Sequence, residues 1–147
     1  MTTVKTCLAQ KPQPTTLVSV GPEDLVVTAL QLMREKHVRS VMVLDGQQLL
    51  GIVTQGDCAI KVLLPGHDAK EVRVKEIMTS KPMTVKPTDP LEACMGLMAS
   101  RNFRHLPVLD AGRVVGVISI GDVVKDRIRE MGQQINFLET YIKGHGA

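Results

Sequence analysis

The chain repeats itself once, and this internal repeat limits its possible folds more than any other feature of the sequence. Sliding the sequence by 65 positions places residues 18–57 on residues 83–122 without a gap. Two copies are too few for a solenoid. We therefore expect two related units that pack face to face in one body with pseudo-twofold symmetry. Identical residues occur at Val20/Val85, Pro22/Pro87, Asp24/Asp89, Leu32/Leu97, Met33/Met98, Arg39/Arg104, Val43/Val108, Leu44/Leu109, Asp45/Asp110, Gly51/Gly116, Gly56/Gly121 and Asp57/Asp122.

A shorter echo precedes each copy, with Val4-Lys5 before the first and residues 74–78 before the second. The repeat therefore covers nearly the whole chain. We expect a first repeat at 4–64, a linker at 65–73, a second repeat at 74–130, and a C-terminal helix and tail at 131–147.

Each copy has the pattern of a β-α-β-β-α unit, which predicts an α/β (α+β) fold. An apolar strand precedes residues at helical spacing, then two strands joined by a turn, then a second helix. In the second copy, Asp89-Pro90-Leu91-Glu92 is typical of a helix start with Asp89 as its N-cap. One such layer is too small to cover its own sheet, so the copies are expected to cover each other. The elements are expected at 17–20, 25–33, 41–44, 49–53 and from 57, and at 83–85, 91–98, 108–109, 114–118 and from 122.

Three further packing expectations concern the helices. Cys94 aligns with Ala29 on an apolar helix face and is expected in the core, because free Cys behaves as a small hydrophobe. Met95 fits the same apolar stripe and is also expected to be buried. Residues 123–141 have the pattern of one long amphipathic helix.

Composition excludes several classes of protein. Of 147 residues, 44% are apolar and 22% charged, and no apolar run approaches the roughly 20 residues that span a bilayer, so a soluble globular protein is expected. The N-terminus lacks the apolar stretch of a signal peptide, which predicts a cytosolic location. The three cysteines form no C-x-x-C pair, which argues against a disulfide framework and a zinc site. A net charge of +3 and 2% aromatic residues give no support to nucleic-acid binding.

Residues 51–57 and 116–122 repeat one element, in which a strand ends at a hydroxyl residue and an Asp follows three positions later. Hydroxyl and backbone N–H groups at a helix N-terminus can hold phosphate, and a carboxylate can accept hydrogen bonds from both hydroxyls of a ribose. The alternative is structural, with carboxylates that only cap helices and hydroxyls that only end strands. Duplication favours a ligand, on the argument that an N-cap needs no hydroxyl three residues earlier. The four residues are Thr54, Asp57, Ser119 and Asp122.

Arginine stands just before the middle strand of each copy, as Arg39-Ser40 and Arg104-His105. Arg is a natural bidentate partner for phosphate. The alternative is a solvated cation at a helix C-terminus, where the helix dipole favours it. Neither interpretation is preferred from these residues alone.

Together these motifs resemble a tandem pair of CBS domains, the cystathionine β-synthase type. The resemblance is carried by the two G-h-h-[ST]-x-G-D elements, the Arg-His-Leu-Pro-Val-Leu-Asp run at 104–110, and the lead-in at 74–79 with Pro82 and Val85. It covers roughly residues 4–126. The first copy departs from the pattern where Met42 replaces the proline found at Pro107.

The resemblance implies a regulatory module with two clefts between the repeats that hold adenosine ligands: AMP, ADP, ATP, NAD(H) or S-adenosylmethionine. Asp57 and Asp122 would hold ribose hydroxyls, and Thr54 and Ser119 would contact ribose or phosphate. The adenine would lie between apolar residues near Val20 and Val85 and the strands at Ile52-Val53 and Val117-Ile118. Phosphate would face Arg39, Arg104 and His105.

The resemblance also implies a homodimer and an unidentified target protein. An alternative is a CBS-fold interaction protein that assembles without a ligand. An enzyme is disfavoured, because the sequence offers neither a metal cluster nor an acid and base at recognisable spacing. Cys58, beside Asp57, is a weaker candidate for a redox role.

Overall fold

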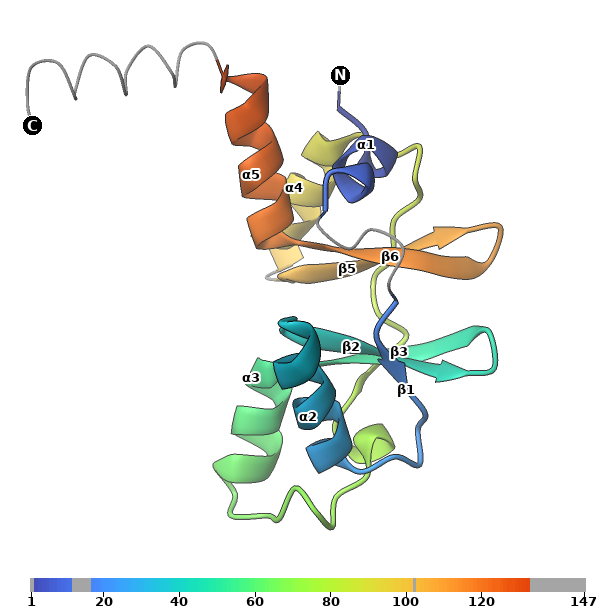
Figure 1. Cartoon of the computed structure of the whole chain (residues 1–147), viewed down its shortest axis with the longest axis vertical. Coiled ribbons are helices and arrows are strands. Elements are labelled where there is room, and N and C mark those ends of the chain that lie inside the picture. Colours follow the sequence, from blue (N-terminus) through green and yellow to red (C-terminus); the bar gives the residue numbers. More distant parts are fainter. Residues whose placement is uncertain (1, 12–16, 102, 133–147) are drawn as a thin grey trace, which may run out of the picture.

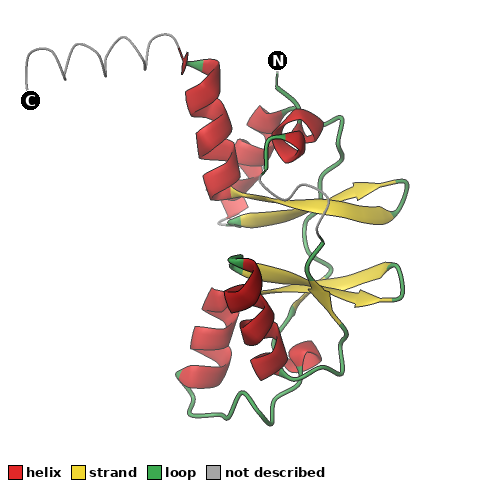
Figure 2. Ribbon diagram, viewed as in Figure 1, coloured by secondary structure: helices red, strands yellow, loops and turns green. Residues whose placement is uncertain are grey.

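The computed structural model describes residues 2–11, 17–101 and 103–132, and Figure 1 shows two layered halves with their sheets toward each other. Helices cover the outer side of each sheet (Figure 2). The elements are α1 (Val4–Ala9), β1 (Ser19–Val20), α2 (Val26–Lys36), β2 (Ser40–Asp45), β3 (Gln48–Thr54), α3 (Gln55–Cys58), the π-helix η1 (Ala59–Leu63), the 3₁₀ helix η2 (Val74–Glu76), β4 (Thr79–Ser80), α4 (Leu91–Arg101), β5 (His105–Asp110), β6 (Arg113–Ser119) and α5 (Ile120–Glu130).

Each half is built around an antiparallel hairpin, as the alternating apolar strands predict. β2 pairs with β3 and β5 pairs with β6, and the two hairpins bulge at equivalent places, after Val43 and after Val108. Gly46 turns the first hairpin at a φ of 62°. Glycine adopts this left-handed conformation without a steric penalty, so the turn forms where the sequence places it.

The two sheets differ in how many strands accompany the hairpin. The first sheet has the order β1-β2-β3-β4, with β1 parallel to β2. The second contains β5 and β6, and the strand expected at 83–85 is reduced to one parallel bridge between Val85 and Val108. The predicted β-α-β-β-α order is confirmed in the first repeat and holds in the second apart from this shortened strand.

The predicted N-cap at Asp89 is wrong. Helix α4 begins at Leu91, two residues later, and Asp89 Oδ2 instead accepts a hydrogen bond from the N–H of Lys86 at 2.8 Å. Asp24 does the same in the first repeat, accepting from the N–H of Gly21 at 2.7 Å. Both carboxylates close a four-residue turn rather than capping a helix.

The lead-in segments are exchanged between the repeats. Val4 and Cys7 lie in the core of the second repeat, and Val74 and Ile77 lie in the core of the first. The backbone contacts are equivalent: Val4 N–H donates to Asp89 O at 2.9 Å, and Val74 N–H donates to Asp24 O at 2.8 Å. Each lead-in therefore packs with the repeat opposite to the one in which the predicted boundaries place it.

The inner faces of the two sheets lie toward each other. Val41, Val43 and Val53 point into the first core, so the alternate residues Met42 and Ile52 face the second repeat. Met42, at the position of the expected proline, is completely buried there. The inter-repeat space beside Met42 is therefore filled by an apolar side chain, and β3 contacts β6 across it.

One packing expectation in α4 is confirmed and one is wrong. Cys94 is completely buried, as expected. Met95 is 39% exposed, because the outer side of α4 faces solvent beside α5 rather than a core. Of the helix expected over 123–141, residues up to 130 are helical, and the part beyond 132 lies outside the described residues. Within 2–11, 17–101 and 103–132, no helix combines the length and hydropathy needed to cross a bilayer.

Candidate functional site

The duplicated hydroxyl–Asp elements form the N-terminal caps of α3 and α5. Thr54 Oγ1 accepts from the N–H of Asp57 at 3.1 Å, while Asp57 Oδ2 accepts from the N–H of Thr54 at 3.0 Å. Ser119 and Asp122 exchange the same two bonds, at 3.2 and 2.9 Å. Each pair is therefore a capping box, in which the hydroxyl is the N-cap and the carboxylate is at the third helical position.

This geometry corrects one step of the sequence argument. A capping box requires a hydroxyl three residues before an acidic residue, so the spacing in both copies has a structural explanation without a ligand. The carboxylates are nevertheless not turned fully outward, since Asp57 is 16% and Asp122 17% exposed. The four residues stay predictions as ligand contacts.

Strand pairing brings each predicted arginine to the capping box of its own repeat. Ser40 is paired with Thr54, and His105 with Ser119. The first helical N–H groups then bond back to the arginines: Gln55 N–H donates to Arg39 O at 3.1 Å and Ile120 N–H donates to Arg104 O at 2.9 Å. The sequence motifs that were 15 positions apart therefore meet at one end of each hairpin.

Two lysines that the sequence reasoning missed contact the carboxylates. Lys61 Nζ lies 3.3 Å from Asp57 Oδ1, and Lys11 Nζ lies 3.1 Å from Asp122 Oδ2. Lys61 stands four residues after Asp57 on the same helical segment, a spacing that is readable from the sequence. Lys11 comes from the exchanged N-terminal segment, and no local pattern indicates its contact.

Charges from both repeats gather around His105. Burial lowers the pKa of His105, the nearby carboxylate of Asp122 raises it, and three cations lower it further. One of those cations belongs to the opposite repeat, so the group is assembled between the repeats. The three cations, in order of effect, are Lys11, Arg39 and Arg104.

The predicted adenine contacts lie in the hydrophobic cores. Val20 is 6%, Val85 3% and Ile118 0% exposed, and each belongs to the core of its own repeat. As ligand contacts they stay predictions. By strand alternation, Ile52 and Val117 are the apolar residues of these strands that face the other repeat.

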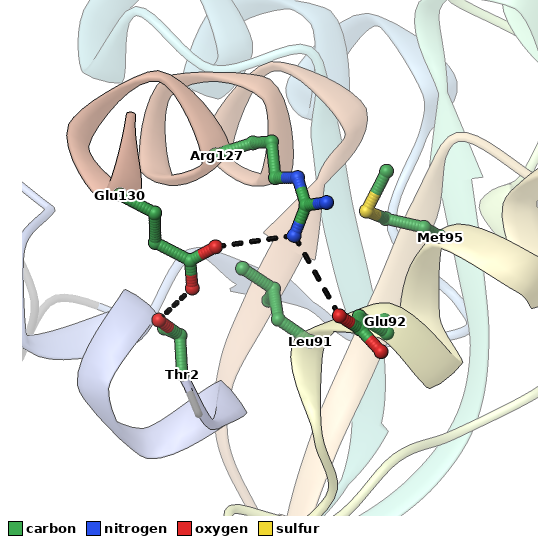
Figure 3. A pocket seen from close by; sticks show the side chains of 6 residues that line it. All are labelled: Thr2, Leu91, Glu92, Met95, Arg127 and Glu130. Atoms are coloured by element: carbon green, nitrogen blue, oxygen red, sulfur yellow. Dashed lines mark hydrogen bonds and ion pairs between the residues drawn. The ribbon is translucent and has the colours of Figure 1, made fainter. Parts of the chain in front are cut away.

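A pocket of about 380 Å³ lies elsewhere, on the outer side of the second repeat (Figure 3). Arg127 sits at its centre, 3.2 Å from Glu130 Oε2 and 3.6 Å from Glu92 Oε1. Thr2 donates a hydrogen bond to Glu130 from the N-terminal side. The guanidinium of Arg127 is already paired with carboxylates, and the pocket contains none of the predicted site residues. The lining residues are Thr2, Leu91, Glu92, Met95, Arg127 and Glu130.

The cysteines have the environment of core residues. Burial raises the pKa of Cys58 to about 11, with the charge of Asp57 adding to the effect. A thiol of this kind is protonated at neutral pH and is a poor nucleophile, which argues against the redox role considered for Cys58. In the described part of the chain, His, Cys, Asp and Glu form no group of three or more placed to hold a metal ion.

Comparison with known proteins identifies both repeats. The family model for the CBS domain matches residues 14–63 and 74–128. The CBS domain-containing protein CBSX3, mitochondrial, of Arabidopsis thaliana is 33% identical over 127 residues. The alignment covers 83% of this chain and 62% of that relative, so this chain corresponds to less than two thirds of CBSX3.

Solved structures share the fold over most of the chain. A putative signal-transduction protein with CBS domains from Burkholderia ambifaria MC40-6 is 45% identical, with a TM-score of 0.83 over 87% of this chain and 95% of that one. The structure of CBSX2 in complex with AMP is 30% identical, with a TM-score of 0.71 over 89% of this chain and 99% of that one. The expected pairing of two β-α-β-β-α repeats is thereby confirmed.

Proposed function

The chain is a member of the CBS-domain family, and on that premise we propose that it is a regulatory module that binds an adenine nucleotide between its repeats and signals to a separate protein. The ligand class is AMP, ADP or ATP, with NAD(H) and S-adenosylmethionine as further adenosine ligands to test. The role is regulatory rather than catalytic, and no resident cofactor is needed. The cytosolic location stays a prediction.

The observation that carries this proposal is the meeting of an arginine, a hydroxyl and a carboxylate at one end of each hairpin. Arg39 lies beside Thr54 and Asp57, and the same arrangement recurs with Arg104 in the second repeat. A capping box accounts for the hydroxyl and the carboxylate, but it does not account for the nearby cations from both repeats. Phosphate recognition by Arg does.

The carboxylates retain capacity to accept further hydrogen bonds. An ionised Asp has about four lone-pair sites, and the backbone N–H of the cap occupies one of them. At Asp57 the Thr54 hydroxyl also donates to Oδ2, at 3.2 Å. In our proposal the ribose hydroxyls take others, in competition with Lys61 or Lys11. His105 and the arginines face the phosphate, and apolar residues of β3 and β6 that face the other repeat contact the adenine.

AMP is the first ligand to test, because CBSX2 was solved in complex with AMP at 30% identity to this chain. Calorimetric titration of nucleotide-stripped protein is expected to give saturable heat. Asp57→Asn and Asp122→Asn keep an oxygen for the cap but lose the charge, so each should weaken binding at its own site by about tenfold or more. Absence of heat from every adenosine ligand, with folded protein, contradicts the proposal.

Asp89→Asn is a matched control. Asp89 also accepts from a backbone N–H three residues earlier, at 2.8 Å, but it lies in the turn before α4. Its substitution should leave AMP affinity within about twofold of wild type, as surface changes away from a site usually do. Equal losses from Asp89→Asn and Asp122→Asn would mean that the effect on binding is structural.

The alternative function is assembly without a ligand, and exposed apolar helix faces favour it. Val124, Ile128 and Met131 follow one another at helical spacing on and after α5 and are 44–51% exposed. The second helical segment of the first repeat exposes Ile60, Leu63 and Leu64 even more. We propose that these faces hold a homodimer together, whether or not nucleotide is bound.

Light scattering with and without AMP separates the two functions. We expect the wild-type protein to be a dimer. Ile128→Glu and Leu63→Glu should each convert it to a monomer, because each places a charge in the apolar contact. Assembly alone would be favoured if the protein binds no nucleotide and if Asp57→Asn and Asp122→Asn leave dimerisation and partner binding unchanged.

A further inference from the structure

We propose that Lys11 selects for phosphate at the site beside Asp122: it holds the Asp122 carboxylate in the free protein and moves to the ligand phosphate when ribose hydroxyls take that carboxylate. The inference rests on the proposed nucleotide function. It adds a residue from the exchanged N-terminal segment, outside the repeated motifs, and makes the two sites different.

The N-terminal segment holds Lys11 firmly within reach of the site. Val4 is completely buried and Cys7 is 2% exposed in the core of the second repeat. Cys7 Sγ also donates to the carbonyl oxygen of Asp122, at 3.7 Å. Only a few residues after this anchor, Lys11 Nζ donates to Val117 O at 2.8 Å and lies 3.1 Å from Asp122 Oδ2.

The ammonium group of Lys11 has a second place to go. The side chain is 29% exposed, and a lysine ammonium is a compact charge on a flexible stem of four carbons. A phosphate near His105 lies among the charges of Arg39 and Arg104 as well. Moving Lys11 from one anion to another keeps its charge neutralised, so the exchange costs little electrostatic energy.

A ribose and Lys11 compete for the same carboxylate. Asp122 Oδ2 already accepts from the N–H of Ser119 at 2.9 Å in the capping box. A nucleoside without phosphate must displace Lys11 and offers it no new anion. A nucleotide displaces Lys11 and also provides an anionic partner, so Lys11 should favour nucleotides over nucleosides.

The first repeat lacks this arrangement. Lys61 belongs to η1, in the same helical segment as Asp57, and its Nζ also donates to Ile77 O at 2.9 Å. Ser40 stands at the position of His105. Lys11 makes an equivalent backbone contact, to Val117 O, so the two lysines differ in what surrounds them. Lys61 contacts Asp57 from the same helical segment and has Ser40 in place of the imidazole of His105, which makes it the matched control for Lys11.

The experiment measures the ratio of AMP affinity to adenosine affinity with one site active at a time. Lys11→Met is tested in Asp57→Asn protein, and Lys61→Met is tested in Asp122→Asn protein, by calorimetry. Lys11→Met should lower the ratio about fivefold, with adenosine binding unchanged or tighter because its competitor is gone. Lys61→Met should change the ratio by less than about twofold. Lys11→Arg keeps the charge and should retain most of the ratio.

Each outcome separates this inference from the proposed function. If Lys11→Met changes the AMP and adenosine affinities by the same factor, the inference is wrong while the nucleotide function stands. Lys11 would then either compete with both ligands equally or support only the fold. If Asp57→Asn protein with Lys11 intact binds neither ligand, the nucleotide function itself fails at Asp122. Thermal melting of every variant confirms that the protein measured is folded.

Discussion

The two repeats share the same central elements and differ in what surrounds their equivalent carboxylates. Both build a bulged hairpin, a capping box and an arginine beside it. In the first repeat, the lysine that contacts Asp57 comes from the following helical turn; in the second, Lys11 reaches Asp122 from the other end of the chain. The first residue of the strand is Ser40 in one repeat and His105 in the other.

This difference shows which constraints a duplicated unit keeps. Core volume, turn geometry and helix caps are needed by each repeat for its own stability, so they are present in both. Charged side chains between the repeats are free of that constraint, because each has solvent or the opposite repeat as its neighbour. The asymmetry between Asp57 and Asp122 is therefore where functional specialisation is expected.

The largest expected effect tests whether the repeats form one unit. Met33 and Met98 occupy equivalent core positions and are 2% and 5% exposed. Replacing either by Ala should lower the free energy of unfolding by about 2–5 kcal/mol, because a cavity remains. Since the exchanged lead-ins tie each core to the other repeat, we expect one cooperative transition in urea, followed by far-UV circular dichroism, for both variants.

Met95→Ala is the control for this prediction. Its side chain is 39% exposed, so the loss should be about 0.5 kcal/mol or less. Two separate transitions in either core variant would show that the repeats unfold independently. They would then be two domains rather than two halves of one domain.

The second prediction uses a pair of equivalent glycines to separate the sheets. A Cβ on Gly51 would lie 2.6 Å from the backbone oxygen of Thr79, whereas a Cβ on Gly116 would lie 2.8 Å from Cδ2 of Leu8, the end of a flexible side chain. Gly51→Ala should therefore cost about 2–3 kcal/mol by pushing β4 from β3, and Gly116→Ala about 1 kcal/mol or less. Chemical denaturation measures both. Equal costs would mean that β4 moves as easily as a side chain.

The third prediction concerns the caps. Thr54→Ala and Ser119→Ala each leave helix N–H groups unsatisfied, and each should lower stability by about 1 kcal/mol. Thr54→Ser and Ser119→Thr keep the hydroxyl and should restore most of it. If the alanine variants were as stable as wild type, the hydroxyls would have no capping role, and ligand contact would be the better account of their duplication.

Much of this architecture was predictable from the repeat alone. Hairpins at 41–53 and 108–118 follow from apolar runs on either side of Asp45-Gly46 and Asp110-Ala111-Gly112, because local turn chemistry fixes strand pairing. The burial of Cys94 followed from its alignment with Ala29 in the other copy. Local signals that recur twice were reliable in these elements.

The exchange of the lead-ins was not predictable in this way. A repeated segment says what a unit contains, but not which copy of the unit it packs against. One available signal was the spacing: Val4 and Val74 lie 70 positions apart, while the copies themselves lie 65 apart. The contact of Lys11 with Asp122 depends entirely on this exchange, so it too was inaccessible from local pattern.

The capping boxes were a misinterpretation rather than a missing signal. The spacing of hydroxyl and acid at 54–57 and 119–122 is that of a capping box. The structural alternative in the sequence analysis took only the Asp as a helix cap and gave the hydroxyl no capping role. Met95 failed for a different reason. Helical spacing identifies an apolar stripe but does not say how wide a face the neighbouring elements cover.

The smallest expected effect is a pH dependence that only the second repeat should show. Burial lowers the pKa of His105 below the ordinary value of 6.5, so the folded protein accepts this proton at lower pH than the unfolded chain does. Below pH 6.5 the unfolded state therefore binds more protons, and stability falls with pH until the folded-state pKa is passed. Above pH 6.5 the imidazole is neutral in both states and contributes no slope. The charged groups that act on it are Asp122, Lys11, Arg39 and Arg104.

His105→Ser, which installs the residue of the first repeat, should remove this part of the pH dependence. We expect the variant to lose less free energy of unfolding than wild type between pH 7 and pH 5, with urea denaturation measured at each pH. Met95→Ala, which alters no titratable group, should keep the wild-type slope. Identical slopes for His105→Ser and wild type would mean that His105 takes up its proton equally in both states. The electrostatic difference of the second site would then rest on Lys11, because both repeats carry an arginine at this place.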